Sequence, residues 1–245
     1  MTIARIYQAT PLFSKASIEL DSAASHHLAS VLRAKIHQKM IVFNGEGGEY
    51  EATITKIEKK KVIIQLGSFN PREAESSLQI CLAQGISRGE KMDFTIQKAV
   101  ELGVTKIVPL LTERCNVKLD AQRREKRLEH WQSIIVSACE QSGRNILPEI
   151  EPPQAFTSWV SSVQMDQGFV LAPIAKQKLH QFSLQKKARV VLLIGPEGGL
   201  SEQEIELATQ KDFAPLNLGP RILRTETAGI AAITALQCYF GDMTN

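Results

Sequence analysis

The sequence predicts an α/β protein in which a small β-rich segment precedes a larger domain built on a parallel sheet. Two features predict this class. The first seventy residues hold short apolar strands separated by glycine-rich turns, whereas the rest of the chain alternates apolar strands with helices. Such alternation is typical of a parallel sheet with helices on both faces. A chain of 245 residues, of which 43% are hydrophobic, has enough apolar material for two domains.

Residues 1–70 are expected to form a small β-barrel. Strands are expected at Ala4–Tyr7, Met40–Phe43, Tyr50–Ile57 and Lys61–Leu66. Apolar residues recur at helical spacing in Ser25–Arg33, which predicts a helix there. The turn Asn44–Gly48 contains three glycines, and short strands joined by such turns favour a barrel.

A polar stretch that contains a proline separates this segment from the rest of the chain. It runs from Ser68 to Ser77, and we place the linker at residues 71–77 within it. Domain boundaries usually fall in exposed, polar segments that few contacts cross. The second domain is therefore expected to span residues 78–245.

The second domain is expected to alternate strands and helices along its length. Strands are expected at Leu78–Gln84, Lys106–Leu111, Gly168–Leu171, Arg189–Ile194 and Pro215–Leu218. Helices are expected at Glu90–Leu102, Asp120–Gln141, Ser201–Gln210 and Thr225–Phe240. Gly103 occupies the position that glycine often takes after a helix end. Ser201 and Glu204 have the spacing of a capping box at a helix start.

The positive charge of the chain is concentrated in its first part. The net charge is +3, and residues 1–70 hold nine Lys or Arg against six Asp or Glu, while the remainder holds twenty of each kind. A small basic module beside a neutral domain is compatible with binding to a polyanion. The alternative is a solvated strand edge, because Lys59, Lys60 and Lys61 flank strands and discourage aggregation. Charge alone does not separate the two interpretations.

The composition gives no indication of a metal site or a membrane segment. The four cysteines are far apart in the sequence and form no C-x-x-C pair, so we expect buried free thiols and no bound metal. No apolar run approaches the roughly 20 residues that a membrane span needs. The N-terminal residues lack the apolar stretch of a signal peptide. We therefore expect a cytoplasmic protein.

Three loops follow expected strands of the parallel sheet, at the edge where ligands bind in such folds. They are residues 171–173, 195–199 and 218–227. Three glycines in the second loop allow the backbone to approach a ligand closely, although a tight turn alone would also need them. The loop is neither a P-loop nor a dinucleotide fingerprint, because it lacks Gly-Lys-Ser/Thr and G-x-G-x-x-G.

The third loop gathers charged residues directly before an apolar helix. Arg221, Arg224 and Glu226 lie within six residues, and such groups are costly to bury without partners. Glu226 has the position of a helix-capping carboxylate, whereas a helix N-terminus disfavours an arginine. Arg224 is therefore expected to have an anionic partner, which is Glu226, a phosphate of a bound polyanion or a developing negative charge on a substrate. Surface ion pairing is the alternative to a substrate site.

These motifs closely resemble the RsmE family of 16S rRNA uridine-N3 methyltransferases, which belongs to the SPOUT superfamily. The matching segments, in the family's order and spacing, are Arg88–Met92, Lys98–Gly103, Glu113–Cys115, Glu140–Asn145, Gly195–Leu200 and Leu218–Ala228. The resemblance covers nearly the whole chain. It implies a PUA-like RNA-binding module in residues 1–70 and a SPOUT methyltransferase domain with a C-terminal trefoil knot, a rare exception to unknotted chains.

The resemblance also implies a cofactor, an RNA substrate and a second subunit. S-adenosylmethionine would be held in a bent shape by the three loops, through Leu171, Ala172, Pro173, Ile194, Gly195, Pro196, Glu197, Gly198, Gly199, Leu218, Gly219, Arg221 and Leu223. The substrate would be 16S rRNA of the small ribosomal subunit, and the enzyme would be a homodimer with RNA engaging both subunits. The basic residues expected to contact RNA are Arg5, Arg33, Lys35, Lys39, Arg88 and Arg114.

The proposed chemistry requires positioning and proton management, because the cofactor brings an activated methyl group. A carboxylate would accept the proton of uridine N3, and an arginine would stabilise charge on O2 and O4. We assign these tasks to Arg224 and Glu226, with Arg144 as a third candidate, and Glu197 is expected to tie the knot loop together. The competing functions are ribose 2′-O-methylation on a SPOUT fold and a non-enzymatic RNA-binding assembly factor.

Overall fold

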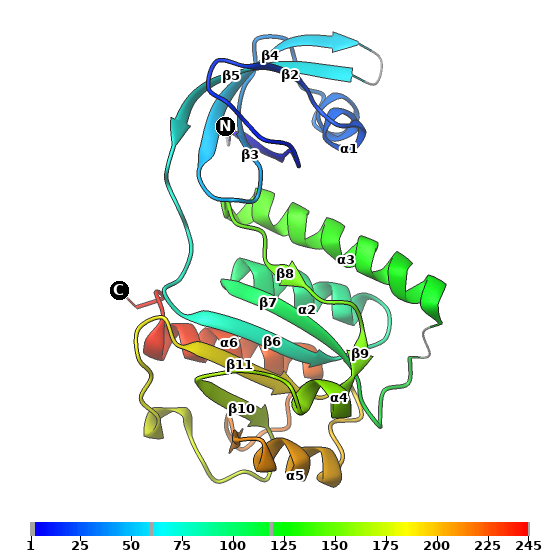
Figure 1. The fold of residues 1–245 in the computed structure, drawn as a ribbon, viewed down its shortest axis with the longest axis vertical. Coiled ribbons are helices and arrows are strands. Elements are labelled where there is room, and N and C mark those ends of the chain that lie inside the picture. The colour runs from blue at the N-terminus through cyan, green and yellow to red at the C-terminus, as the bar shows by residue number, and fades with distance from the viewer. Residues whose placement is uncertain (1–2, 59–60, 118–119, 245) are drawn as a thin grey trace. The chain divides into compact units, whose positions relative to one another are not determined.

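The chain divides into two compact units in the computed structural model, which describes residues 3–58, 61–117 and 120–244 (Figure 1). Unit 1 comprises Met1–Glu75 and Cys139–Leu147, and unit 2 comprises Ser76–Ala138 and Pro148–Asn245. The first division falls within the segment that we expected to be a linker, residues 71–77. The assignment of Cys139–Leu147 to unit 1 was not foreseen, because these residues follow a long helix of the second domain.

Unit 1 is built on a five-stranded sheet. Its strands are β1 (Ala4–Tyr7), β2 (Ser17–Glu19), β3 (Lys39–Phe43), β4 (Glu49–Glu58) and β5 (Lys61–Asn70), in the spatial order β1-β3-β4-β5-β2. β1 pairs with β3 in parallel, and the other pairs are antiparallel. Within the described residues no ladder joins β1 to β2, so backbone pairing does not close the expected barrel. Lys59 and Lys60 lie outside the described residues, and Lys61 pairs with Glu19 at the surface.

The helix expected at Ser25–Arg33 begins earlier and changes its winding. Helix α1 (Ser22–His26) starts after Asp21, whose carboxylate accepts a hydrogen bond from the Ala24 N–H at 2.8 Å. Asp is a favoured N-cap because its side chain satisfies an amide that the helix leaves free. The chain continues into a π-helical turn, η1 (His27–Val31). Arg33 then takes a left-handed conformation, with φ of 50°, and ends the helix.

A buried hydrogen-bond network joins Cys139–Leu147 to the rest of unit 1. Arg144 forms an ion pair with Glu75 at 2.5 Å, and only 3% of its side chain is exposed. Asn145 accepts a hydrogen bond from the Arg5 guanidinium at 2.5 Å and donates one to the carbonyl of Arg72 at 2.7 Å. Arg5 also pairs with Glu49 at 2.6 Å and has only 14% of its side chain exposed. Each buried charge is therefore matched by a partner, as burial requires.

Unit 2 is built on a parallel sheet whose central strands are continuous apolar runs. Its strands are β6 (Gln79–Gly85), β7 (Val104–Leu111), β8 (Glu149–Ile150), β9 (Gln154–Ala155), β10 (Gln167–Leu171), β11 (Arg189–Ile194) and β12 (Phe213–Leu216). The order is β12-β10-β11-β6-β7-β8, and β9 adds a second pairing to β7. All these pairs are parallel. The carboxyl ends of β10, β11 and β12 therefore lie side by side at one edge.

Helices cover both faces of this sheet, which confirms the expected α/β class. They are α2 (Glu90–Glu101), α3 (Ala121–Ser142), α4 (Phe156–Val160), the 3₁₀ turn η2 (Leu179–Gln181), α5 (Glu202–Gln210) and α6 (Thr225–Phe240). Trp159 of α4 and Ala208 of α5 share a core with Val191 of β11. Gly229 of α6 lies against Ile194 on the other face, as the alternation of side chains along β11 requires. No helix among the described residues is long and apolar enough to cross a membrane.

We predict that Arg144→Ala destabilises the protein by about 3 kcal/mol, because breaking a buried ion pair leaves one charge without compensation. Urea unfolding of the purified protein measures the change. Lys61→Ala is the matched control, since its pair with Glu19 is well exposed and should contribute almost nothing. Equal unfolding midpoints for wild type and Arg144→Ala would contradict a structural role for this pair.

Candidate active site

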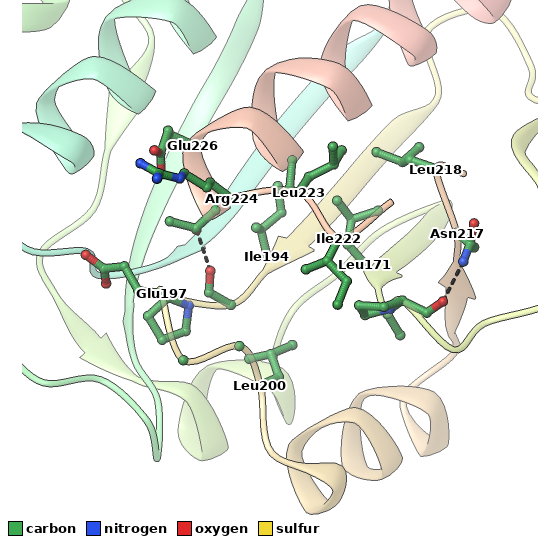
Figure 2. A pocket seen from close by; sticks show the side chains of 18 of the residues that line it. Leu171, Ile194, Glu197, Leu200, Asn217, Leu218, Ile222, Leu223, Arg224 and Glu226 are labelled. Carbon is green, nitrogen blue, oxygen red and sulfur yellow. Dashed lines mark hydrogen bonds between the residues drawn. The ribbon is translucent and has the colours of Figure 1, made fainter. Parts of the chain in front are cut away.

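A cavity of about 550 Å³ opens at the carboxyl ends of β10, β11 and β12. Its walls come from the three loops that follow these strands, together with the start of α6 (Figure 2). All thirteen residues expected to bind the cofactor line this cavity, and so do Arg224 and Glu226. The structure therefore brings these residues together, while their binding roles stay predictions.

The loop after β11 is both a tight turn and a cavity wall, so the two interpretations of its glycines are compatible. A Cβ atom on Gly195 would lie 2.6 Å from the carbonyl carbon of Gly199, which leaves no room for any side chain. Gly199 has φ of 71°, and its N–H donates to the carbonyl of Pro196 at 2.8 Å. Left-handed backbone of this kind favours glycine. At these two glycines the turn therefore presents only backbone groups to the cavity.

A buried hydrogen-bond group fixes the start of α6 against this loop. The hydroxyl of Thr225 donates to the carbonyl of Gly195 at 2.6 Å, and the amide nitrogen of Gln84 donates to the Thr225 hydroxyl at 2.9 Å. The same amide nitrogen lies 3.2 Å from the Gly195 carbonyl. Gln84 is fully buried at the end of β6. Three segments far apart in the sequence are thus joined at one point, directly between Arg224 and Glu226.

Asn217 performs a similar task on the opposite side of the cavity. Its amide nitrogen donates to the carbonyl of Pro173 at 2.6 Å (Figure 2). Its oxygen accepts from the N–H of Gly219 at 2.7 Å and from Lys178 at 2.7 Å. These bonds hold the loop after β10 against the loop after β12. Asn217 was not predicted from the sequence, although an asparagine just after a strand and shortly before a glycine is typical of a turn in which the side chain bonds the local backbone.

Apolar side chains form much of the cavity wall. The labelled side chains of Leu171, Ile194 and Leu223 lie close together at its centre, between the ends of β10 and β11 and the start of α6 (Figure 2). The lining residues that were not predicted to bind the cofactor or to act in catalysis are Lys91, Arg114, Leu200, Ile205, Leu216, Asn217, Ile222, Thr225 and Ala228. An apolar pocket with a few polar groups is the usual form of a small-molecule site.

Arg224 and Glu226 lie at the mouth of α6 without an ion pair between them in the described residues. Arg224 is the N-cap residue of α6, and its side chain is exposed. Glu226 lies in the first turn of the helix, and its Oε2 atom is buried without a hydrogen-bond partner. Figure 2 shows both side chains on the same side of the cavity. Buried polar atoms normally have a partner, so this carboxylate has capacity for an additional donor.

Glu197 connects the loop after β11 to the segment after β6. Its carboxylate accepts from the N–H of Arg88 at 3.0 Å and lies 3.5 Å from the Lys91 ammonium. Burial alone would raise the pKa of Glu197, but the Arg88 N–H and the Lys91 charge hold this pKa below its usual value. Arg114 donates to the carbonyl of Gly198 at 3.1 Å. Arg88 and Arg114, both expected to contact RNA, are exposed and adjoin this loop.

The remaining expected site residues lie in unit 1. Arg33, Lys35 and Lys39 are exposed there, as an RNA contact requires. Arg5 and Arg144 are not available in the same way, because both guanidinium groups are held by buried or part-buried carboxylates. Arg144 does not line the cavity. Arg5 was expected to contact RNA and Arg144 to be a catalytic candidate, whereas their carboxylate partners are distant in the sequence and visible only in the fold.

The chain matches family models and solved structures along nearly its whole length. Residues 74–237 match the RNA methyltransferase domain, and residues 20–67 match the RNA methyltransferase PUA domain. It is 41% identical to ribosomal RNA small subunit methyltransferase E of Buchnera aphidicola from Schizaphis graminum, over 99% of this chain and 98% of that protein. The chain belongs to the ribosomal RNA small subunit methyltransferase E family.

Two solved structures resemble this member of the methyltransferase E family over 99% of its chain. A putative methyltransferase from Legionella pneumophila, in complex with the cofactor SAM, has a TM-score of 0.97 at 40% identity and is covered over its full length. A ribosomal RNA small subunit methyltransferase E from Neisseria gonorrhoeae, bound to S-adenosyl methionine, has a TM-score of 0.92 at 37% identity and is also fully covered. A PUA-like first domain and a parallel α/β second domain are thus confirmed.

We predict that Thr225→Val lowers methyltransferase activity at least tenfold, because the residues on either side of Thr225 would lose their anchor. Loss of the hydroxyl should also cost about 1 to 2 kcal/mol of stability, since the Gly195 carbonyl loses the Thr225 donor and the Gln84 amide loses one of its acceptors. Thr225→Ser keeps the hydroxyl and should remain close to wild type in both assays. A Thr225→Val enzyme with wild-type activity would contradict the positioning role.

Proposed function

We propose that this protein transfers a methyl group from S-adenosylmethionine to N3 of a uridine in the 16S rRNA of the small ribosomal subunit. The observation that carries the proposal is the cavity at the three loops, whose lining includes every residue that the family resemblance assigns to the cofactor. Relatives of the same family are named for ribosomal RNA methylation, and two structural neighbours hold the same cofactor. We place the enzyme in the cytoplasm, where ribosomal RNA is modified.

The residues of the cavity fit this cofactor. Leu171, Ile194 and Leu223 offer apolar surface for the adenine ring, and the backbone of residues 195–199 offers N–H and carbonyl groups for its polar edge. The free Oε2 atom of Glu226 can accept a further hydrogen bond. The bound cofactor would supply an electrophilic methyl group, so no nucleophile from the protein is needed.

The chemical step requires the proton of N3 to leave as the new N–C bond forms. Glu226 is proposed to accept this proton, since its Oε2 atom has no partner in the protein. Arg224 is proposed to stabilise the negative charge that spreads onto O2 and O4, and no ion pair within the described residues competes for its guanidinium. The S–C bond breaks in the same step, and its electron pair stays on sulfur. Arg144 is given no role in this step, because its guanidinium is paired with Glu75 and it is not among the residues that line the cavity.

We also propose that the three loops form a trefoil knot and that the enzyme is a homodimer. Support for the knot is that loops after three adjacent strands converge on one cavity with the start of α6. Support for the dimer is the exposure of Ile174 and Ile222, at 86% and 85%, in or beside these loops. Exposed apolar patches often mark a surface that another chain covers.

We predict a dimer of this chain in solution, because a second copy would cover these isoleucines. Multi-angle light scattering at micromolar concentration measures the mass directly. Ile222→Asp should shift the population towards monomer, since a carboxylate would be desolvated in the interface. A monomeric wild-type protein would contradict the dimer without touching the proposed chemistry.

We predict that Arg224→Ala reduces the single-turnover methylation rate by about 10²–10³, as expected for loss of one group that stabilises transition-state charge. The melting temperature and the affinity for S-adenosylmethionine should stay close to wild type. Arg224→Lys, which keeps the charge but not the planar guanidinium, should recover only part of the rate. A fully active Arg224→Ala enzyme would exclude this role.

We predict that Glu226→Gln is inactive near neutral pH and partly recovers as the pH rises. The N3 anion of uridine then forms in solution, so an enzyme that lacks the proton acceptor is helped more than wild type.

Mass spectrometry of rRNA from a deletion strain, before and after complementation, identifies the modified base. Appearance of a 2′-O-methyl ribose in place of N3-methyluridine would favour the competing activity.

A further inference from the structure

A short segment of unit 1 combines positive charge with exposed apolar side chains. We call residues 31–39 the basic-apolar segment. Residues 22–45 contain no Asp or Glu, whereas Arg33, Lys35 and Lys39 lie within the segment. All three are exposed, and none forms an ion pair within the described residues. The segment therefore carries uncompensated positive charge equal in size to the net charge of the whole chain.

The same segment exposes three large aliphatic residues. Val31, Leu32 and Ile36 have 60%, 45% and 48% of their surface exposed. Neighbouring apolar residues of unit 1, such as Leu28 and Met40, are fully buried or nearly so. Single exposed aliphatic residues are normal, but three within six positions form a patch of the kind that binds another molecule. Charge and apolar surface are thus presented together.

The backbone of the segment is held in place while its side chains stay free. The N–H of Ala34 donates to the carbonyl of Leu28 at 2.9 Å, and the N–H of His37 donates to the carbonyl of Ile54 at 2.8 Å. Arg33 and His37 have φ of 50° and 69°, in the left-handed region that favours glycine. The preceding π-helical turn, η1, is also an uncommon structure. Strained backbone conformations and π-helical turns are frequent at functional sites. They lower the stability of the fold, so they persist only where the surrounding structure holds them.

We propose that the basic-apolar segment binds an unpaired stretch of the RNA substrate, with Val31, Leu32 and Ile36 against exposed bases and the three cations against phosphates. This inference rests on the proposed function, because it takes RNA as the substrate. The RNA substrate offers both chemistries at once, namely a phosphate at every nucleotide and apolar base faces. Base faces are accessible only where bases are unstacked, and the major groove of an RNA duplex is too narrow for side chains. The segment would therefore distinguish unpaired RNA from duplex RNA.

The test compares apolar and basic variants of the segment in salt-dependent RNA binding. The probes are a 12-nucleotide oligouridylate and a duplex of the same length, and the variants are Leu32→Ser/Ile36→Ser and Lys35→Ala/Lys39→Ala. The apolar variant should lose about tenfold in affinity for the single strand, because the two serines bury much less apolar surface against the bases than Leu32 and Ile36 would. Its slope of log affinity against log salt should not change, because no phosphate contact is lost.

The basic variant should behave in the opposite way. Each phosphate contact that is lost should reduce the salt slope by about 0.7 on single-stranded RNA. Ile3→Ser is the matched control for the apolar change, since Ile3 lies in the same unit outside the segment and is 56% exposed. This control should keep wild-type affinity. All variants should keep the wild-type melting temperature and affinity for S-adenosylmethionine.

Three outcomes would overturn the proposal. The first is equal single-strand affinity for wild type and the apolar variant. The second is equal loss of affinity for the single strand and the duplex, which would mean that base faces are not contacted. The third is a change in sedimentation of the apolar variant with unchanged RNA binding, which would assign the patch to a protein interface. Wild-type protein that neither binds nor methylates RNA would instead contradict the proposed function itself.

Discussion

The carbonyl of Gly195 is the point on which the geometry of the site depends. It accepts from the Thr225 hydroxyl at 2.6 Å, and the Gln84 amide nitrogen lies 3.2 Å away. A strand end, a glycine loop and a helix start are thereby fixed within one buried group. The glycine is required there, because any Cβ would collide with Gly199. Hydrogen bonds between buried groups are costly to break, so Arg224 and Glu226, on either side of Thr225, are anchored to the core.

Much of the fold was predictable because its strands and helices carry strong local patterns. The expected strand at Arg189–Ile194 and the expected helix at Thr225–Phe240 agree with β11 and α6 in both bounds. The capping box of Ser201 and Glu204 was confirmed as well. Strands β2, β8 and β9 were missed because they have only two or three residues, too few for a periodic pattern. They exist through pairing with a neighbouring strand, which is a property of the fold.

Site residues were predictable from the sequence where the backbone conformation requires a particular residue type. They were not predictable where their role depends on a hydrogen-bond or ion-pair partner that is distant in the sequence. Glycines and a proline after an apolar strand located the loop at residues 195–199. By contrast, Gln84 lies 141 residues before Thr225, and nothing in the local sequence marks it as that residue's partner. Arg5 and Arg144 looked like free cations for the same reason, since their carboxylates lie 44 and 69 residues away. Only the tertiary contacts show whether a charged side chain is available to solvent or to a ligand.

The late contribution of Cys139–Leu147 to unit 1 has a consequence for how the chain is made. The N-terminal domain of a protein normally folds first during synthesis. Here Arg5 and Glu75 remain without their partners Asn145 and Arg144 until the ribosome has added the latter residues. A buried charge without its partner destabilises a compact state, so the nascent N-terminal unit stays incomplete until Leu147, 72 residues beyond Glu75, has been added. The first unit can therefore be completed only after the first part of the second unit has been translated.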